Sequence, residues 1–346
     1  MRICICNQGY SGYWVACWRE LMSREGVELR IYTPQTHYPY AADFLAGLPV
    51  TILSAAEMAD GTILRNDIAA WHPDVLLISG WASPVFCSLA HDERLKDIKK
   101  LLMMDSAWSG SIRQILNRFR LRRFVKQLDG VIVGGERGRK FARWLGFPAK
   151  RIYTSIYGYD AKSFEKDRAE WPRRFCFVGR YAPVKGILTL VEAYREYRTV
   201  KGNEAWPLDC YGNGDLKDVL AAQEGIVDHG FLQPDKLPDA LLDEGVFVFP
   251  SLHEPWGVAL AEACGSGLPA IVSDKVTSGD DLVEDEVNGF VFKAGSVRQL
   301  CAALCKMHDS AALLPKMGTA SKVKARHFAP DRWANRWMEA IHDICR

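Results

Sequence analysis

Short runs of β-branched and apolar residues alternate with segments of helical periodicity along nearly the whole chain of 346 residues. This alternation is typical of α/β proteins, because parallel strands are joined through helices that cover the sheet. In the first half the strands are predicted at residues 2–6, 29–33, 50–53, 75–79, 100–104, 130–133 and 151–156. In the second half they are predicted at 175–178, 208–211, 226–229, 245–249, 270–273 and 289–292. The pattern therefore predicts two doubly wound domains with parallel sheets and helices on both faces.

The pattern breaks between residues 158 and 172, where a charged stretch precedes the strand predicted at Phe175. We place the domain boundary there, with domains at residues 1–160 and 161–329. Residues 330–346 are predicted as a terminal helix that begins at Pro330, a residue favoured in the first turn. Its apolar face is expected to pack back on the N-terminal domain and consists of Trp333, Trp337, Ile341 and Ile344.

Composition excludes several classes of protein. Hydrophobic residues make up 48% and charged residues 25% of the chain, which is usual for a globular protein and unlike a disordered one. The ten cysteines and eight histidines are scattered, so reduced, mostly buried thiols are expected and no metal site is predicted. Neither a signal-peptide core nor a run of about 18 apolar residues is found, so a cytoplasmic or membrane-surface protein is expected.

Positive charge is concentrated in residues 112–143, which carry ten basic and two acidic side chains. This segment either forms a solvated helix face or attracts an anionic lipid or a phosphate-bearing substrate. Nucleic acid is not expected as a partner, because the sequence pI of about 8.0 is below the usual basic footprint. The basic residues are Arg113, Arg118, Arg120, Arg122, Arg123, Lys126, Arg137, Arg139, Lys140 and Arg143.

Two strand-to-helix turns contain paired glycines but lack the dinucleotide-binding pattern G-x-G-x-x-G. Gly9 and Gly12 follow the first strand, where they either let a ligand approach the backbone or only make a tight turn. Gly212 and Gly214 follow the strand at 208–211, but Lys217 stands where the third glycine would be. A dinucleotide site is therefore not supported.

The turn after residues 175–178 carries two permanent cations. Arg180 and Lys185 flank the start of a helix predicted at residues 187–198. Free amides and a partial positive charge at a helix start, together with these side chains, would make a phosphate site. The alternative is an ordinary loop with two exposed cations.

The segment 249–269 contains a strand end, a turn and a helix. Glu254 lies in the turn, and Glu262 lies eight residues later on the helix, so both carboxylates can face one cleft. Backbone amides from Gly257 to Ala259 would suit a diphosphate. Carboxylates beside a phosphate site make sense if they accept hydrogen bonds from hydroxyls, as a ribose and a sugar would offer. The alternative is two unrelated acidic residues on a surface helix.

With these motifs, residues 174–295 resemble the donor domain of family 4 of the retaining glycosyltransferases, whose GT-B fold has two facing Rossmann-like domains. Glu254 and Glu262 form the E-x7-E signature, with Pro255 and Gly257 as its Pro-x-Gly filling. Further matches are Gly179-Arg180, Lys185-Gly186 and residues 265–269. The resemblance implies an acceptor-binding first domain and a second domain that binds the nucleotide-sugar donor.

The resemblance also implies roles for individual residues. Arg180 and Lys185 would bind the donor diphosphate and stabilise the charge that builds on the leaving group. Glu262 would hold the ribose hydroxyls, and Glu254 a hydroxyl of the transferred sugar. Neither a metal nor another cofactor is needed in this scheme, since two cations and a helix end serve instead. The remaining donor-binding residues would be Gly179, Phe231 near the base, and Trp256, Gly257, Val258 and Ala259 near sugar and phosphate.

The N-terminal half departs from the family. Gly12 aligns with a paired glycine of which one member is missing, and Asp105 stands where members usually carry a histidine. Asp105 either takes the place of that histidine near the reacting sugar or only caps its turn. Residues 157–160 occupy the position of the interdomain turn of the family.

The function implied is retaining transfer of a sugar from a nucleotide-diphosphate sugar to a hydroxyl of a glycan or a lipid-linked acceptor. A UDP-sugar is expected before a GDP-sugar, and surface polysaccharide or glycoconjugate synthesis on the inner face of a membrane is the expected setting. Alternatives are a sugar-nucleotide epimerase of the same fold, a non-catalytic sugar-nucleotide-binding protein and a membrane-associated scaffold.

Overall fold

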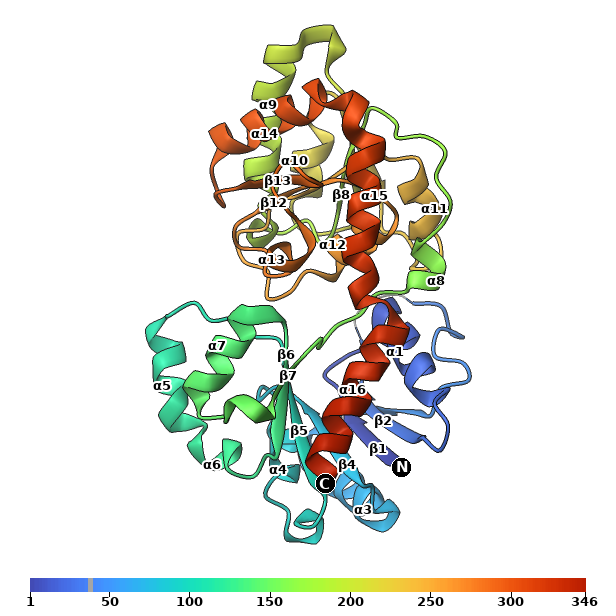
Figure 1. Cartoon of the computed structure of the whole chain (residues 1–346), viewed down its shortest axis with the longest axis vertical. Helices are drawn as coiled ribbons and strands as arrows, with labels where there is room; N and C mark the ends of the chain where they lie inside the picture. Colours follow the sequence, from blue (N-terminus) through green and yellow to red (C-terminus); the bar gives the residue numbers. More distant parts are fainter. Residues whose placement is uncertain (37–39) are drawn as a thin grey trace. The chain divides into compact units, whose positions relative to one another are not determined.

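The computed structural model describes residues 1–36 and 40–346 and divides them into two compact units (Figure 1). The first unit consists of Met1–Tyr159 together with Pro330–Arg346, and the second of Asp160–Ala329. The chain therefore passes from one unit to the other between Tyr159 and Asp160 and returns after Ala329.

The first unit is built on a sheet of seven parallel strands in the order β3-β2-β1-β4-β5-β6-β7. Its central strands are almost entirely apolar, as expected for strands buried on both faces. The last strand is shorter than predicted because Ser155, directly after it, has a positive φ of 77° that ends the extended conformation. The strands are β1 (Arg2–Cys6), β2 (Glu28–Pro34), β3 (Val50–Leu53), β4 (Val75–Ser79), β5 (Lys99–Met104), β6 (Gly130–Val133) and β7 (Ile152–Thr154).

The second unit contains a sheet of six parallel strands in the order β10-β9-β8-β11-β12-β13. Together the two sheets confirm the predicted α/β fold class. The strands are β8 (Phe175–Val178), β9 (Leu208–Tyr211), β10 (Ile226–Gly230), β11 (Val246–Phe249), β12 (Ala270–Ser273) and β13 (Gly289–Phe292).

Helices cover both faces of each sheet. In β1, for example, Cys4 and Cys6 contribute to the core on one face, while Ile3 and Ile5 contribute to the core on the other. The first unit holds α1 (Gly12–Met22), α2 (Ala55–Asp60), α3 (Thr62–Trp71), α4 (Pro84–Leu89), α5 (Ile112–Arg120), α6 (Arg122–Val125), α7 (Gly135–Leu145) and α16 (Pro330–Cys345). The second unit holds α8 (Ala161–Phe164), α9 (Ile187–Lys201), α10 (Lys217–Ala221), α11 (Leu237–Leu242), α12 (Val258–Gly265), α13 (Gly279–Leu282), α14 (Val297–Asp309) and α15 (Leu314–Ala325).

Strand order reverses beside the first strand of each sheet. β1 lies between β2 and β4, and β8 lies between β9 and β11. In open α/β sheets ligands bind beyond the carboxyl ends of the strands at such reversal points, because successive connections leave the sheet on opposite faces there. In the second unit a ligand site is therefore expected at the loops that follow β8 and β11.

The ten cysteines are free thiols, and seven of them are buried. Among the described residues no helix has both the length and the apolar character that a membrane crossing requires.

Helix α16 closes the first unit and lies beside α1 (Figure 1). Trp333 and Trp337 are fully buried, and their rings are 4.1 Å apart between centroids. The indole Nε1 of Trp337 donates to the carbonyl of Ser155 at 2.9 Å, and that of Trp333 donates to Ile156 at 3.2 Å. The last residues of the chain thus complete the core of the first unit.

We expect Trp337→Ala to lower the free energy of unfolding by about 3 to 5 kcal/mol, because it empties a large buried volume and leaves the Ser155 carbonyl without its donor. Denaturant unfolding measures this change. Glu339→Ala, an exposed position on the same helix, is the control and should shift stability by less than about 0.5 kcal/mol. Equal losses of unfolding free energy for the two substitutions would contradict the conclusion that the buried face of α16 stabilises the first unit.

Candidate functional site

The loop after β8 begins the candidate site. Arg180 is exposed, and its side chain makes neither a hydrogen bond nor an ion pair with any residue that the structure describes. The backbone around it is fixed, since the Gly179 amide donates to Tyr211 at 3.0 Å and the Tyr181 amide to Asn213 at 2.8 Å. A positioned backbone therefore presents an unpaired guanidinium group.

Glycine is required where this loop meets its neighbours. A Cβ on Gly186, at a φ of +73°, would lie 2.1 Å from the carbonyl oxygen of Pro250, just after β11. A Cβ on Gly212 would lie 1.9 Å from the carbonyl oxygen of Gly179. The paired glycines after β9 are thus explained by close backbone packing within the unit. The loops after β8, β9 and β11 form one tightly packed group at the strand ends.

This packing brings together two residues that the sequence separates widely. The Lys185 ammonium donates to the Glu254 carboxylate, and both side chains are largely buried, with 19% and 11% exposed. The hydroxyl of Ser251 donates to the same carboxylate at 3.4 Å, and Lys185 Nζ lies 5.6 Å from the centroid of the Phe249 ring. The sequence assigned Lys185 to phosphate and Glu254 to a sugar hydroxyl, and it gave no sign that the two contact each other.

Helix α12 begins at the same place. Its N-cap residue Gly257 has a φ of +100°, and a Cβ there would lie 2.8 Å from the Phe249 ring and 2.9 Å from Glu254 Cγ. Within the described chain, the amides of Gly257, Val258 and Ala259 have no hydrogen-bond acceptor. Free amides at a helix start are a ready site for an anion. The Trp256 ring, by contrast, is buried against Phe328, so only the backbone of Trp256 is placed to meet a ligand.

Glu262 lies on α12 and is partly buried. Its carboxylate has no hydrogen-bond or ion-pair partner among the described residues. Burial, assisted by the negative charge of Asp160, raises the pKa of Glu262 to about 7. A half-buried carboxyl without a partner is costly for a fold, and it is available to a ligand that donates hydrogen bonds.

Phe231 follows β10 in the second unit and is 37% exposed. The turn before it is held by Asp228, which accepts from the Tyr181 hydroxyl at 2.7 Å and from the Gly230 amide at 2.9 Å. Sequence reasoning missed this support, because a single aspartate in a β-strand carries no recognisable signal.

The remaining predicted residues belong to the first unit. Asp105 follows β5, is exposed, and accepts a hydrogen bond from the Tyr157 hydroxyl at 3.3 Å. Gly12 is the first residue of α1. A Cβ on Gly9 would meet no atom within 4 Å, so packing of the described residues does not require glycine there. The structure therefore gives no packing reason for Gly9.

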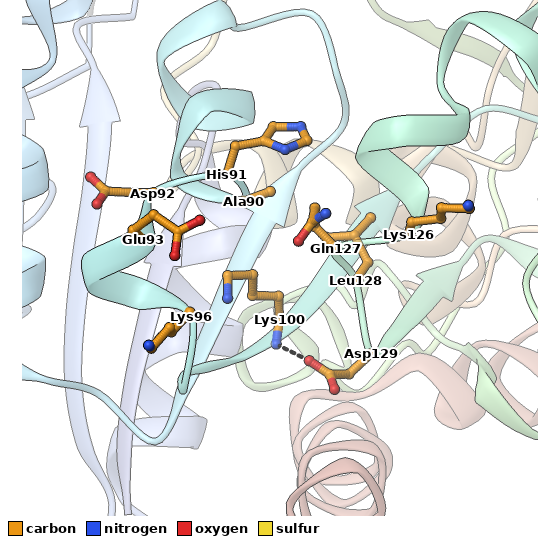
Figure 2. A pocket seen from close by; sticks show the side chains of 10 residues that line it. All are labelled: Ala90, His91, Asp92, Glu93, Lys96, Lys100, Lys126, Gln127, Leu128 and Asp129. Carbon is orange, nitrogen blue, oxygen red and sulfur yellow. Dashed lines mark hydrogen bonds between the residues drawn. The ribbon is translucent and has the colours of Figure 1, made fainter.

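A polar cavity of about 200 Å³ lies elsewhere in the first unit (Figure 2). It is near the amino ends of β5 and β6, whereas Asp105 follows the carboxyl end of β5. Lys100 lines this cavity, and its ammonium donates to the carbonyls of Leu95 at 2.7 Å and Ile98 at 2.9 Å. Asp129 accepts from the Lys100 amide at 2.8 Å, the bond drawn in Figure 2. None of the predicted site residues lines this cavity.

In the part of the chain that the structure describes, no cluster of three or more potential ligands is arranged to hold a metal ion. The candidate site in the second unit therefore consists of two cations, two carboxyls and a helix start. They can bind a ligand that combines phosphate with hydroxyl groups.

Comparison with known proteins gives a family match for the second unit. Residues 159–324 match the family model described as glycosyl transferases group 1. The matched segment covers nearly all of the second unit. The second unit is thus similar to the glycosyl transferases of group 1.

Two curated relatives come from bacteria. The amylovoran biosynthesis glycosyltransferase AmsK of Erwinia amylovora is 26% identical over 194 residues, which are 52% of this chain and 47% of the relative. A UDP-Gal:alpha-D-GlcNAc-diphosphoundecaprenol alpha-1,3-galactosyltransferase of Escherichia coli is 35% identical over 150 residues, 40% of this chain and 37% of the relative. The chain thus spans less than half the length of these relatives.

Among solved structures, Anabaena Alr3699/HepE in complex with UDP and glucose has a TM-score of 0.76 and 14% identity. The alignment covers 99% of this chain and 100% of that chain. At this identity the likeness concerns the fold, which extends over both units.

We expect Glu262→Gln to stabilise the unliganded chain at pH 8 by about 1 to 2 kcal/mol, a value reduced for partial exposure to water. The folded state holds the proton of Glu262 up to a pKa of about 7, well above the ordinary value of 4.5. The charged carboxylate therefore lowers stability progressively as pH rises through this window, and amide substitution removes the loss.

Thermal unfolding of both proteins at pH 5.5 and pH 8 measures this effect, which should be clearly larger at pH 8. Glu192→Gln, on the exposed side of α9, is the control with no pH-dependent gain. A stability difference between the two proteins that is the same at both pH values would show that burial does not raise the pKa of Glu262.

Proposed function

We propose that this chain is a retaining glycosyltransferase that moves a sugar from a nucleotide-diphosphate sugar to a hydroxyl of a glycan or lipid-linked acceptor. The observation that carries the proposal is the group of complementary charges at the carboxyl ends of β8 and β11. There an unpaired Arg180 and the Lys185–Glu254 pair lie in loops that pack together, and helix α12, which follows one of these loops, carries free amides at its start and the unpaired Glu262.

The diphosphate would bind to the positive groups. Arg180 offers a planar fork of donors, and the start of α12 offers amides that have no acceptor among the described residues. In the reaction the bond between the anomeric carbon and the phosphate oxygen breaks, and negative charge builds on the departing diphosphate. Donors that are fixed before the reaction stabilise this charge without reorganisation, which is the largest contribution such a site can make. No metal is needed in this scheme.

The contact between Lys185 and Glu254 allows the two residues to bind the phosphate and the transferred sugar side by side. An ammonium group has three donors, so Lys185 can keep its bond to Glu254 and still donate to a phosphate oxygen. Glu254 in turn has acceptor capacity left for a hydroxyl of the transferred sugar. Because its charge is already engaged by Lys185, Glu254 is a weak nucleophile, and we favour attack of the acceptor on the same face with the departing phosphate taking the acceptor proton. This choice replaces the covalent intermediate used by retaining glycosidases.

Glu262 would accept hydrogen bonds from the two ribose hydroxyls. This assignment gives a partner to a carboxyl that lacks one in the unliganded chain. Phe231, exposed after β10, would stack on the base. We assign Asp105 to the reacting sugar in place of the histidine that the family carries, and Gly9 and Gly12 to the acceptor side.

The names of similar proteins suggest the substrates. A relative from Escherichia coli uses UDP-Gal and a diphosphoundecaprenol-linked sugar, and a structural neighbour was solved with UDP and glucose. We therefore propose a UDP-sugar as donor, ahead of a GDP-sugar, and a role in surface polysaccharide or glycoconjugate synthesis.

Arg180→Ala is expected to lower kcat by about 100-fold or more while the fold persists, because the residue is exposed and would act mainly on charge in the transition state. Steady-state kinetics with a UDP-sugar and a lipid-linked acceptor measure this loss. Arg173→Ala, an exposed arginine before the amino end of β8, is the matched control. Turnover within a few fold of wild type for Arg180→Ala would refute the assignment.

A thermal-shift screen against nucleoside diphosphates and their sugars tests the donor directly. The true donor, at about 100 times its Kd, should stabilise the chain by about 2.7 kcal/mol. Glu262→Gln should weaken the response to UDP but leave that to inorganic diphosphate unchanged. NMR of the product then determines whether the anomeric configuration is retained. Stabilisation by a nucleotide sugar without any acceptor-linked product would favour an epimerase or a binding protein.

A further inference from the structure

Helix α5 buries a polar face and exposes an apolar one, the reverse of an ordinary surface helix. Its buried residue is Asn117, and Gln114 faces the same side, with its amide donating to the Ala107 carbonyl at 2.7 Å. The Gln114 side-chain oxygen accepts from the Ser109 amide at 2.7 Å. Polar side chains thus attach α5 to the first unit, where an amphipathic helix normally uses apolar ones.

The apolar stripe of α5 points into solvent. Ile112, Ile115, Leu116 and Phe119 follow the spacing i, i+3, i+4, i+7 that defines one helix face. Their exposed fractions are 77%, 39%, 51% and 70%. Single exposed apolar residues are common, but four large ones in one stripe form a patch that normally marks an interaction surface.

Arginine and lysine surround this stripe. The exposed side chains of Arg113 and Arg120 on α5, and of Arg122 and Arg123 on α6, form no ion pair with the described residues, and the same holds for Lys126. The two acidic residues of the segment are engaged elsewhere. Asp129 pairs with Lys99 at 3.4 Å, and Glu136 pairs with Arg139 at 3.5 Å. The surface around α5 is therefore apolar at its centre and positively charged at its rim.

The helix is held rigidly in this orientation. The Arg118 guanidinium donates to the Trp144 carbonyl at 2.7 Å, and its carbon lies 5.4 Å from the centroid of the Trp144 ring. Ser111 caps the first turn by accepting from the Gln114 amide. Figure 1 shows α5 on the outer side of α7. The apolar stripe is thus presented by a preformed helix that needs no folding on contact.

We propose that α5 docks this chain on an anionic phospholipid bilayer, with the apolar stripe inserted at the level of the headgroups and the basic rim on lipid phosphates. Charge complementarity decides the occupant. A bilayer with anionic lipids offers apolar depth and negative charge together, as interfacial helices require. A second copy would oppose the same cations to each other. The proposal goes beyond the sugar chemistry and can fail independently of it, because vesicle binding needs no turnover.

Flotation with vesicles tests the proposal on the full chain. Wild type should bind vesicles of phosphatidylcholine with 30 mol% phosphatidylglycerol at about 0.1 M salt, bind pure phosphatidylcholine at least about tenfold more weakly, and dissociate as salt is raised. The variant Ile112→Ser/Leu116→Ser/Phe119→Ser should lose at least about tenfold in partition. Arg113→Ser/Arg120→Ser should lose a similar amount. These side chains are exposed, so the melting temperature should not change.

Val200→Ser/Val323→Ser is the matched control, since it removes exposed apolar side chains from α9 and α15 of the second unit and should bind vesicles like wild type. Equal binding to neutral and anionic vesicles, or full binding by the serine triple variant, would overturn the proposal. So would a dimer in sedimentation velocity that the triple variant converts to a monomer, because a second copy would then be the occupant of the stripe.

Discussion

Backbone packing without room for a Cβ is the constraint on which the second unit depends. Gly186 lies against the Pro250 carbonyl, and Gly212 lies against the Gly179 carbonyl. These contacts hold the loops that follow three strands at backbone distance, and they bring Lys185 within reach of Glu254. The charge arrangement at the site is therefore a consequence of main-chain geometry. Side chains on longer, looser loops would have no fixed relation to one another.

Periodicity determined the sheets almost completely from sequence. Parallel strands buried on both faces read as short apolar runs, and the helices between them restore the polar surface, so the signal repeats with each unit of the fold. The departures are local. Strand β7 ends early because Ser155 adopts a left-handed conformation. A serine is not typical of a positive φ, so the sequence does not predict this end.

The candidate site was less accessible from the sequence. Arg180, Lys185 and Glu254 were predicted because they lie in strand-to-helix turns, and Glu262 because it follows Glu254 by eight residues on the next helix. Their mutual contacts could not be found, because a pair such as Lys185 and Glu254 depends on strand order, which the sequence does not state. The same limit explains α5. Its apolar stripe has the periodicity of a core-facing helix, and only the structure shows Asn117 buried in its place.

A raised pKa alone does not identify such a site, and two carboxyls of the second unit show why. Burial raises the pKa of Glu244 to about 8, with smaller effects of nearby charges, yet its Oε1 accepts from the buried Tyr211 hydroxyl at 2.6 Å, and its position precedes β11. Glu262 has a pKa of about 7 but no partner, and it follows β11 on the helix whose first amides are free. The first carboxyl has one oxygen bonded to Tyr211 and the other without a hydrogen-bond partner. It lies at the amino end of the sheet, however, where parallel sheets do not bind ligands. The second lies at the carboxyl end, and neither of its oxygens has a hydrogen-bond partner among the described residues. Its position at that strand end and its unmet hydrogen bonding, rather than its raised pKa, make Glu262 the candidate for ligand binding.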